Sequence, residues 1–187
     1  MDRELVKRAR EGDEAAFETL AMASHARLYR LARGILRDGD QADDAVQRTL
    51  VQMWRKLRQL RDPERFEAWT YRLLVNACHD EVRHGRDRAR VLPVDEIREP
   101  TGPDELHTVE DNDQLERGFG RLSLEHRSVV VLRYLLDLPI EQMAEILDVP
   151  GGTVSSRLHR AMTELRAAIE ADARAGIETR NAEGALR

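Results

Sequence analysis

The sequence predicts an all-α protein made of two small helical domains joined by an acidic, proline-rich linker. Three observations predict this class. Aromatic residues make up only 4% of the 187 residues, and Ala, Leu, Arg and Glu are abundant, which favours helix over strand. Apolar residues recur at helical spacing on both sides of residues 92–113. That segment carries three prolines and a net charge of −7, which breaks helices and keeps the chain extended.

Residues 1–91 are predicted to form a bundle of three long amphipathic helices. The first follows a cap at Asp13, the second opens at Asp40, and the third begins at Asp62 with Pro63 in its first turn. The predicted apolar stripes contain Phe17, Leu20, Ala21, Leu28, Leu31, Ala32, Ile35, Val46, Leu50, Met53, Trp54, Leu57, Phe66, Trp69, Leu73, Ala77 and Val82.

Residues 114–171 are predicted to form a second, smaller helical domain. Ser123 caps its first helix, a short helix starts near Pro139, and a longer one starts near Thr153 after a turn that contains Gly151 and Gly152. A short helix, a tight turn and a longer helix are typical of a helix-turn-helix. An ordinary helical hairpin with a polar solvent face is the alternative. Residues 172–187 show little pattern and are predicted to be a flexible tail.

Composition excludes several classes of function. No run of about 18 apolar residues and no leader-like N-terminus is present, so no membrane association is expected. The single cysteine, Cys78, cannot build a disulfide or a multi-cysteine metal site. Glu81 and His84 have the spacing of one half of a di-iron motif, but no second copy exists and arginines surround them. We therefore expect no enzyme, no cofactor, no metal and no small-molecule substrate.

Several motifs resemble the extracytoplasmic-function (ECF) subfamily of bacterial RNA polymerase sigma factors. The runs 122–134 and 138–161 resemble the fourth conserved domain of these factors. GDEAAF (12–17), ADDAVQ (42–47) and FEAWTYRLLVN (66–76) resemble the second. The resemblance spans about residues 5 to 170. It implies a cytoplasmic protein that binds core RNA polymerase, directs promoter-specific transcription initiation at −10 and −35 elements, and assists strand opening.

The resemblance also implies roles for residues of the first domain. The helix from Asp43 to Leu57 would bind the coiled coil of the polymerase's largest subunit, and a purely core role for Trp54 stays open. Phe66 and Trp69 are expected in the core, with a role as stacking platforms for bases as the alternative, and Thr70 replaces the family's usual leucine. The candidates for polymerase are Asp43, Asp44, Gln47, Arg48, Val51, Trp54 and Arg55. The candidates for the −10 element are Arg61, Asp62, Arg65, Tyr71, Arg72, Asn76, Asp80 and Arg83.

In the second domain, the helix after the turn would read the −35 element. Ser155 stands where the family has Lys or Arg, which removes one phosphate-binding cation. Arg157 is interpreted either as a DNA contact or as a residue that holds the turn. The implied partners are core polymerase (the coiled coil and the flap), promoter DNA and an anti-sigma protein. The −35 candidates are Arg133, Thr153, Ser155, Ser156, Arg157, His159 and Arg160.

Charge separates this interpretation from an autonomous helix-turn-helix regulator. Residues 115–171 have a net charge of −1, so this domain alone offers few of the phosphate contacts that hold duplex DNA. In a sigma factor each domain can bind DNA weakly by itself, because the two domains are tethered and polymerase supplies further affinity. The linker of 22 residues could reach about 70 Å. Its charge resembles that of a nucleic acid strand, so we predict that it threads a basic channel of the polymerase; a solvated spacer is the alternative.

Overall fold

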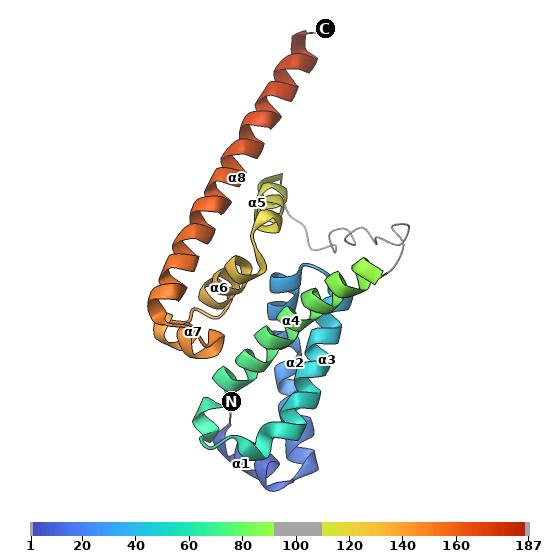
Figure 1. The fold of residues 1–187 in the computed structure, drawn as a ribbon, viewed down its shortest axis with the longest axis vertical. Helices are drawn as coiled ribbons and strands as arrows, with labels where there is room; N and C mark the ends of the chain where they lie inside the picture. The colour runs from blue at the N-terminus through green and yellow to red at the C-terminus, as the bar shows by residue number, and fades with distance from the viewer. Residues whose placement is uncertain (1, 92–109, 186–187) are drawn as a thin grey trace.

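The computed structural model describes the backbone of residues 2–91 and 110–185, and the side chains of residues 2–85 and 115–172. Within these ranges every regular element is a helix (Figure 1), which confirms the predicted all-α class with two helical regions. No helix among the described residues is long and apolar enough to cross a membrane.

The first region contains four α-helices, one more than predicted. They are α1 (Arg3–Glu11), α2 (Glu14–Leu36), α3 (Gly39–Lys56) and α4 (Phe66–Val91), with 3-10 turns at Leu57–Gln59 and Pro63–Arg65 before α4. Asp13 caps α2 as predicted, by accepting a hydrogen bond from the N–H of Ala16. The cap of α3 is Asp38 and not Asp40, because the Asp38 carboxylate accepts the N–H of Gln41.

The core of this region matches the predicted stripes closely. Leu20, Leu28, Leu31, Met53 and Phe66 are almost completely buried. Two threonines are also buried, and each satisfies its hydroxyl by donating to the backbone carbonyl four residues earlier: Thr49 to Ala45 and Thr70 to Phe66. Thr70 therefore fits the core position in which the family's leucine is expected.

The second region contains α5 (Glu110–Arg121), α6 (Leu124–Leu135), α7 (Ile140–Leu147) and α8 (Gly151–Ala185). Ser123 caps α6 as predicted, by accepting the N–H of His126. Helix α5 was not predicted, and it begins inside the segment predicted as linker. It packs along α8, which runs on far beyond the other helices of this region (Figure 1).

The structure corrects the prediction for the C-terminal tail and leaves the prediction for the linker untested. The structure replaces the tail predicted at 172–187 by a continuation of α8 to Ala185, because the Ala, Arg and Glu residues there favour helix. Most of the predicted linker, residues 92–109, lies outside the described residues. Its passage through a polymerase channel stays a prediction.

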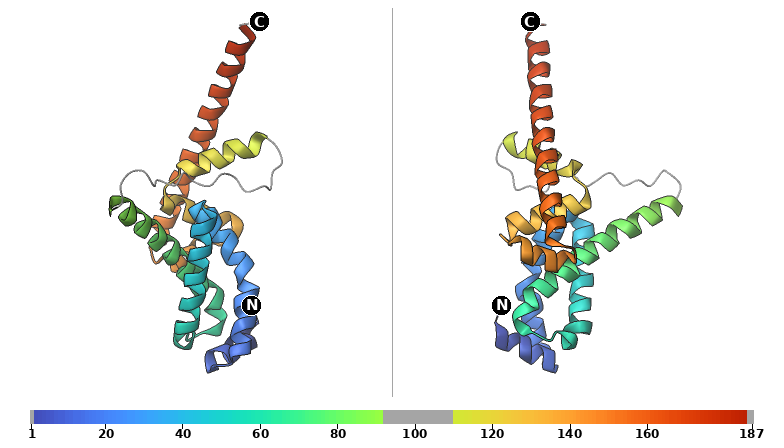
Figure 2. Two further views of the ribbon diagram at one scale, coloured as in Figure 1. Left: turned by 90° about the vertical axis from the view of Figure 1, so that its right-hand side faces the viewer. Right: turned by 60° about the vertical axis from the view of Figure 1, so that its left-hand side comes forward.

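The two regions lie directly against each other (Figure 2). Helix α6 packs on α2, and α7 packs on α4. The closest approach in the middle of this contact is at Gly34 of α2, where a Cβ atom would lie 3.0 Å from Cγ2 of Val131. The side chain of Val131 is 3% exposed, so the centre of the contact is apolar and closely packed.

Candidate nucleic-acid and protein-binding surfaces

The outward face of α3 gathers most of the residues predicted to bind polymerase. They recur every three or four positions, which places them on one side of the helix while Ala45, Val46 and Met53 face the core. Val51 and Trp54 are 49% and 47% exposed although they are apolar. We call this set the α3 face; it consists of Asp43, Asp44, Gln47, Val51, Trp54 and Arg55.

Trp54 is anchored against the bundle on one side and exposed on the other. One edge of its ring meets Phe17 of α2 at a centroid distance of 4.8 Å and an interplanar angle of 64°, an edge-to-face contact that anchors the side chain. The rest of the ring borders a hollow of about 300 Å³ that Arg55 and Arg58 also line. The exposed part of Trp54 is thus held in a fixed orientation beside a concave surface.

Arg48 is the member of the predicted set that the structure separates from the α3 face. Its Nη1 lies 2.5 Å from Oε2 of Glu81 on α4, and the Glu81 side chain is only 5% exposed. That Glu81 oxygen makes no hydrogen bond of good geometry, so the contact is ionic. Arg48 therefore joins α3 to α4. Glu81 is engaged in this pair, whereas His84 is exposed.

One face of α4 carries most of the residues predicted for the −10 element. From Arg72 on, they recur every three or four residues along one side of α4, and Arg65 ends the 3-10 turn directly before this helix. Arg61 and Asp62 lie in the preceding loop. We call these residues the α4 face: Arg65, Arg72, Asn76, Asp80 and Arg83. Phe66 is buried and Trp69 packs against the core, which confirms that both belong to the bundle.

Tyr71 lies away from this face, in the core. It is 5% exposed, and its hydroxyl accepts a hydrogen bond of 2.8 Å from Nη1 of Arg27 on α2. Burial raises the pKa of the Tyr71 hydroxyl, although the guanidinium of Arg27 opposes the shift. Arg27 also lies 3.4 Å from Glu67. Sequence reasoning missed Arg27, since nothing in its local pattern indicates a partner 44 residues away.

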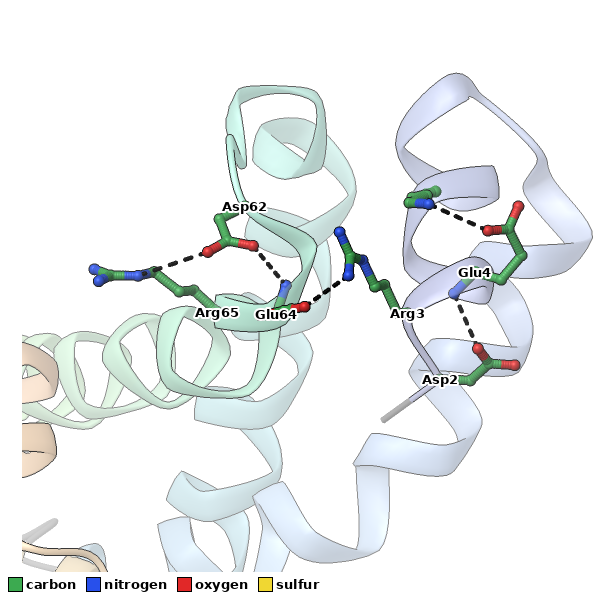
Figure 3. A network of polar contacts seen from close by, with 7 residues as sticks. Asp2, Arg3, Glu4, Asp62, Glu64 and Arg65 are labelled. Atoms are coloured by element: carbon green, nitrogen blue, oxygen red, sulfur yellow. Dashed lines mark hydrogen bonds and ion pairs between the residues drawn. The ribbon is translucent and has the colours of Figure 1, made fainter.

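The loop before α4 is held in place by α1, a helix that the sequence did not predict. Asp62 caps the turn by accepting the N–H of Glu64 at 3.0 Å, and Nη1 of Arg3 donates to Glu64 at 2.7 Å (Figure 3). Arg10 donates to the carbonyls of Leu60 and Arg61. These contacts position the loop and leave the side chain of Arg61 exposed.

In the second region, α7 and α8 form the predicted helix-turn-helix. Asp148 ends α7 in the left-handed conformation at φ 56°, which Asp tolerates better than most side chains. Thr153 is half-buried, and its carbonyl accepts a hydrogen bond from the hydroxyl of Ser156 at 3.0 Å. The first turns of α8 expose one polar strip, which we call the α8 face: Ser155, Ser156, His159 and Arg160.

The other two −35 candidates are engaged within the molecule. Arg133 donates to the carbonyl of Leu138 at 2.9 Å and so braces the loop between α6 and α7. Arg157 is half-buried, and its charge helps to lower the pKa of His79 on α4, so it lies close to the first region. The choice between a DNA contact and a turn-holding role for Arg157 stays a prediction.

Comparison with known proteins defines the class of this chain. The family model for Sigma-70 region 2 matches residues 20–88, and the model for Sigma-70 region 4 matches residues 112–165. The first match contains α3 and most of α4, and the second contains the helix-turn-helix. The two regions thus have the arrangement of a sigma-70-type factor.

Relatives identify the family more closely. The chain is 34% identical to the ECF RNA polymerase sigma factor SigM of Mycobacterium tuberculosis, over 88% of this chain and 82% of that protein. It is 30% identical to the RNA polymerase sigma factor SigV of Bacillus subtilis, over 74% and 81%. The chain belongs to the ECF RNA polymerase sigma factors and is a promoter-directing sigma factor.

Solved structures share the fold. CnrH, in complex with the cytosolic domain of CnrY, superposes with a TM-score of 0.65 at 28% identity, over 91% of this chain and 98% of that chain. The sigma factor RpoE of Bartonella quintana, in complex with the anti-sigma factor NepR, gives a TM-score of 0.66 at 22% identity, over 83% and 98%.

Proposed function

We propose that the protein binds core RNA polymerase through the α3 face, captures the −10 element with the α4 face and reads the −35 element with the α8 face. One observation carries the proposal: three exposed strips of suitable chemistry occur on three different helices, all within the two matched sigma-70 regions. The alternative of an autonomous regulator is not favoured, since it gives no role to the α3 face.

The α3 face has the composition of a protein-binding surface. Its two exposed apolar side chains, Val51 and Trp54, are surrounded by charged residues, which is the pattern of an apolar centre and a polar rim. Tryptophan is enriched among the residues that dominate binding energy, and the contact with Phe17 limits the entropy that its ring loses on binding.

The α4 face supports single-strand capture through cations and hydrogen-bonding groups. Arg65 and Arg72 stand at one end of this face and Arg83 at the other, with the polar Asn76 and Asp80 between them. Guanidinium groups bind phosphates along a strand, and amide or carboxylate groups can bond base edges. The neighbouring aromatic residues offer little area for stacking, because Tyr71 and Phe66 are buried and Trp69 is half-buried against the core. We infer that capture depends on hydrogen bonds and charge more than on stacking.

The α8 face supports duplex reading. The N-terminal turns of the second helix of a helix-turn-helix enter the major groove, where arginine can bond the O6 and N7 of guanine. Arg160 is the exposed cation of this face, and the serines and His159 add shorter donors and acceptors. Because the α8 face is weakly charged, we propose that most of the affinity for promoter DNA comes from core polymerase, which binds this protein through its coiled coil and flap. Polymerase also carries out the catalysis, and both proteins act in the cytoplasm.

The proposal extends to an inhibitory partner. Both structural neighbours were solved with a second protein bound, and for RpoE that protein is an anti-sigma factor. We propose that an anti-sigma protein also binds this chain.

Reconstituted transcription with core polymerase and a promoter library tests the proposal. We expect Val51→Arg to weaken core binding at least tenfold, because it places a charge in the apolar centre of the α3 face. Met22→Arg is the matched control: Met22 is 70% exposed on α2, outside all three faces. Equal binding by both variants would exclude the α3 face. Tight, salt-resistant duplex binding by the free protein would favour the autonomous regulator.

A further inference from the structure

We propose that helix α7 holds the free protein in a closed, autoinhibited state by occupying the arginines of the α4 face with its own carboxylates. This inference rests on the proposed function, because it takes the α4 face as the surface for −10 DNA. In the closed state, α7 and single-stranded DNA compete for the same guanidinium groups.

Two ion pairs join α7 to the α4 face. Nη2 of Arg72 lies 2.7 Å from Oδ2 of Asp148, within hydrogen-bonding distance, and Nη1 of Arg65 lies 3.6 Å from Oε2 of Glu145. The two carboxylates are three residues apart at the end of α7, so they present neighbouring negative charges to one arginine just before α4 and one on α4. The acidic end of α7 thus occupies positions that phosphates would take.

The carboxylates of α7 and the phosphates of DNA compete for the charge and the N–H donors of these arginines. A guanidinium binds carboxylate and phosphate oxygens through the same N–H donors, and a charge-assisted pair of 2.7 Å uses the geometry that a phosphate would need. Both ion pairs are at the surface, with 43% of the Arg72 side chain exposed. Exposed pairs are weak and screened by salt, so a DNA strand brought by polymerase can displace them.

A second set of contacts keeps α7 in place. On the other side of the junction, α6 packs its buried Val131 against Gly34 of α2. Nη1 of Arg37 donates to the carbonyl of Glu116 at 2.6 Å, which joins the end of α2 to α5. These contacts orient the second region so that α7 covers the N-terminal half of the α4 face while the α8 face stays exposed.

Two variants open the closed state by different means. Glu145→Gln with Asp148→Asn removes both charges with little change of shape, and Asn tolerates the left-handed conformation of residue 148. Gly34→Leu acts sterically, because its side chain would meet Val131. It also raises the helix propensity of α2, so the first region should still fold.

The chain offers a closely matched control for the charge variant. Glu141→Gln with Asp137→Asn makes the same two chemical changes near the start of α7. Asp137 also has a left-handed backbone, at φ 50°, and neither residue forms an ion pair with the described residues.

The experiment measures closure and DNA binding on the full chain. Dyes are attached to cysteines introduced at Ala23 of α2 and Ala167 of α8, both exposed. Native Cys78 will not compete for label, since it is buried and burial raises its pKa to about 12. Affinity is measured with a single-stranded oligonucleotide of the −10 sequence that the promoter library selects.

We expect both opening variants to lower energy transfer and to tighten oligonucleotide binding at least threefold, and the control to change neither. Unchanged energy transfer in both variants would overturn the closed state. Reduced transfer without a gain in affinity would overturn the autoinhibition. Transcription by the parent protein with core polymerase tests the proposed function separately, because polymerase-bound protein is already open.

Discussion

At the scale of single residues, the most informative difference between expectation and structure is Arg48. Its sequence position places it with the polymerase-binding candidates, yet its charge is directed at the buried carboxylate of Glu81. A buried carboxylate that loses its counter-charge is costly, whereas an arginine that is 38% exposed can still reach water. Removing the charge of Arg48 should therefore destabilise the protein more than removing the charge of Glu81.

We predict that Arg48→Met lowers the free energy of unfolding by about 1–3 kcal/mol, discounted from the value for a fully buried pair because Arg48 is partly exposed. Glu81→Gln should cost less than about 1 kcal/mol, and the double variant less than the sum of the two. Urea unfolding measures all three. Arg83→Met, which breaks the exposed pair with Asp80, is the control and should change stability by less than about 0.5 kcal/mol. Equal losses for Arg48→Met and Arg83→Met would contradict the structural role of Arg48.

At the scale of elements, each surface lies along one side of a helix; periodicity indicated the α8 face, whereas the resemblance to sigma factors implied the candidates on α3 and α4. The exceptions are instructive. Tyr71 belongs to the buried side of α4 although its neighbour Arg72 is on the exposed side, and its hydroxyl is satisfied by Arg27. Helix α1 escaped prediction because it is short and highly charged, yet it braces the loop that precedes α4.

For helix α8 we predict that Arg160→Ala reduces discrimination between the selected −35 sequence and a variant lacking its guanines. The loss should be about 1–3 kcal/mol, or about 5-fold to 150-fold. Arg166→Ala, which removes the same charge nearly two turns further along α8, should leave discrimination unchanged. Promoter competition with the reconstituted holoenzyme is the measurement. If Arg160→Ala instead weakened binding equally for all promoter sequences, Arg160 would be assigned to a phosphate contact.

At the scale of the whole molecule, His79 lies where the two regions meet. Its Nε2 is 3.5 Å from Oγ of Ser128 on α6. Burial lowers the pKa of His79 below its ordinary value of 6.5, and Arg157 and Arg83 add to the shift while Glu125 and Asp80 oppose it. The closed state therefore prefers the neutral ring.

From this we predict that acidification opens the molecule. Above about pH 6.5 the ring is neutral in both states and closure is unaffected. As the pH falls below 6.5 the open state binds the proton more readily, so closure weakens until the lower pKa of the closed state is passed. Energy transfer between labels at Ala23 and Ala167 should decrease from pH 7.5 to pH 5.5. In His79→Gln the decrease should be smaller, and an identical decrease would assign it to other groups.

The sequence by itself determined the helical class and most helix starts, because capping residues and apolar spacing are local signals, and periodicity also indicated the polar face of α8. It also carried the resemblance that identified the family. Only the tertiary structure decided that Arg48 pairs with Glu81, that Tyr71 is buried on Arg27, and that the acidic end of α7 lies on the α4 face. Each of these contacts joins residues more than 30 positions apart, and their formation depends on how whole helices pack, which no local pattern encodes.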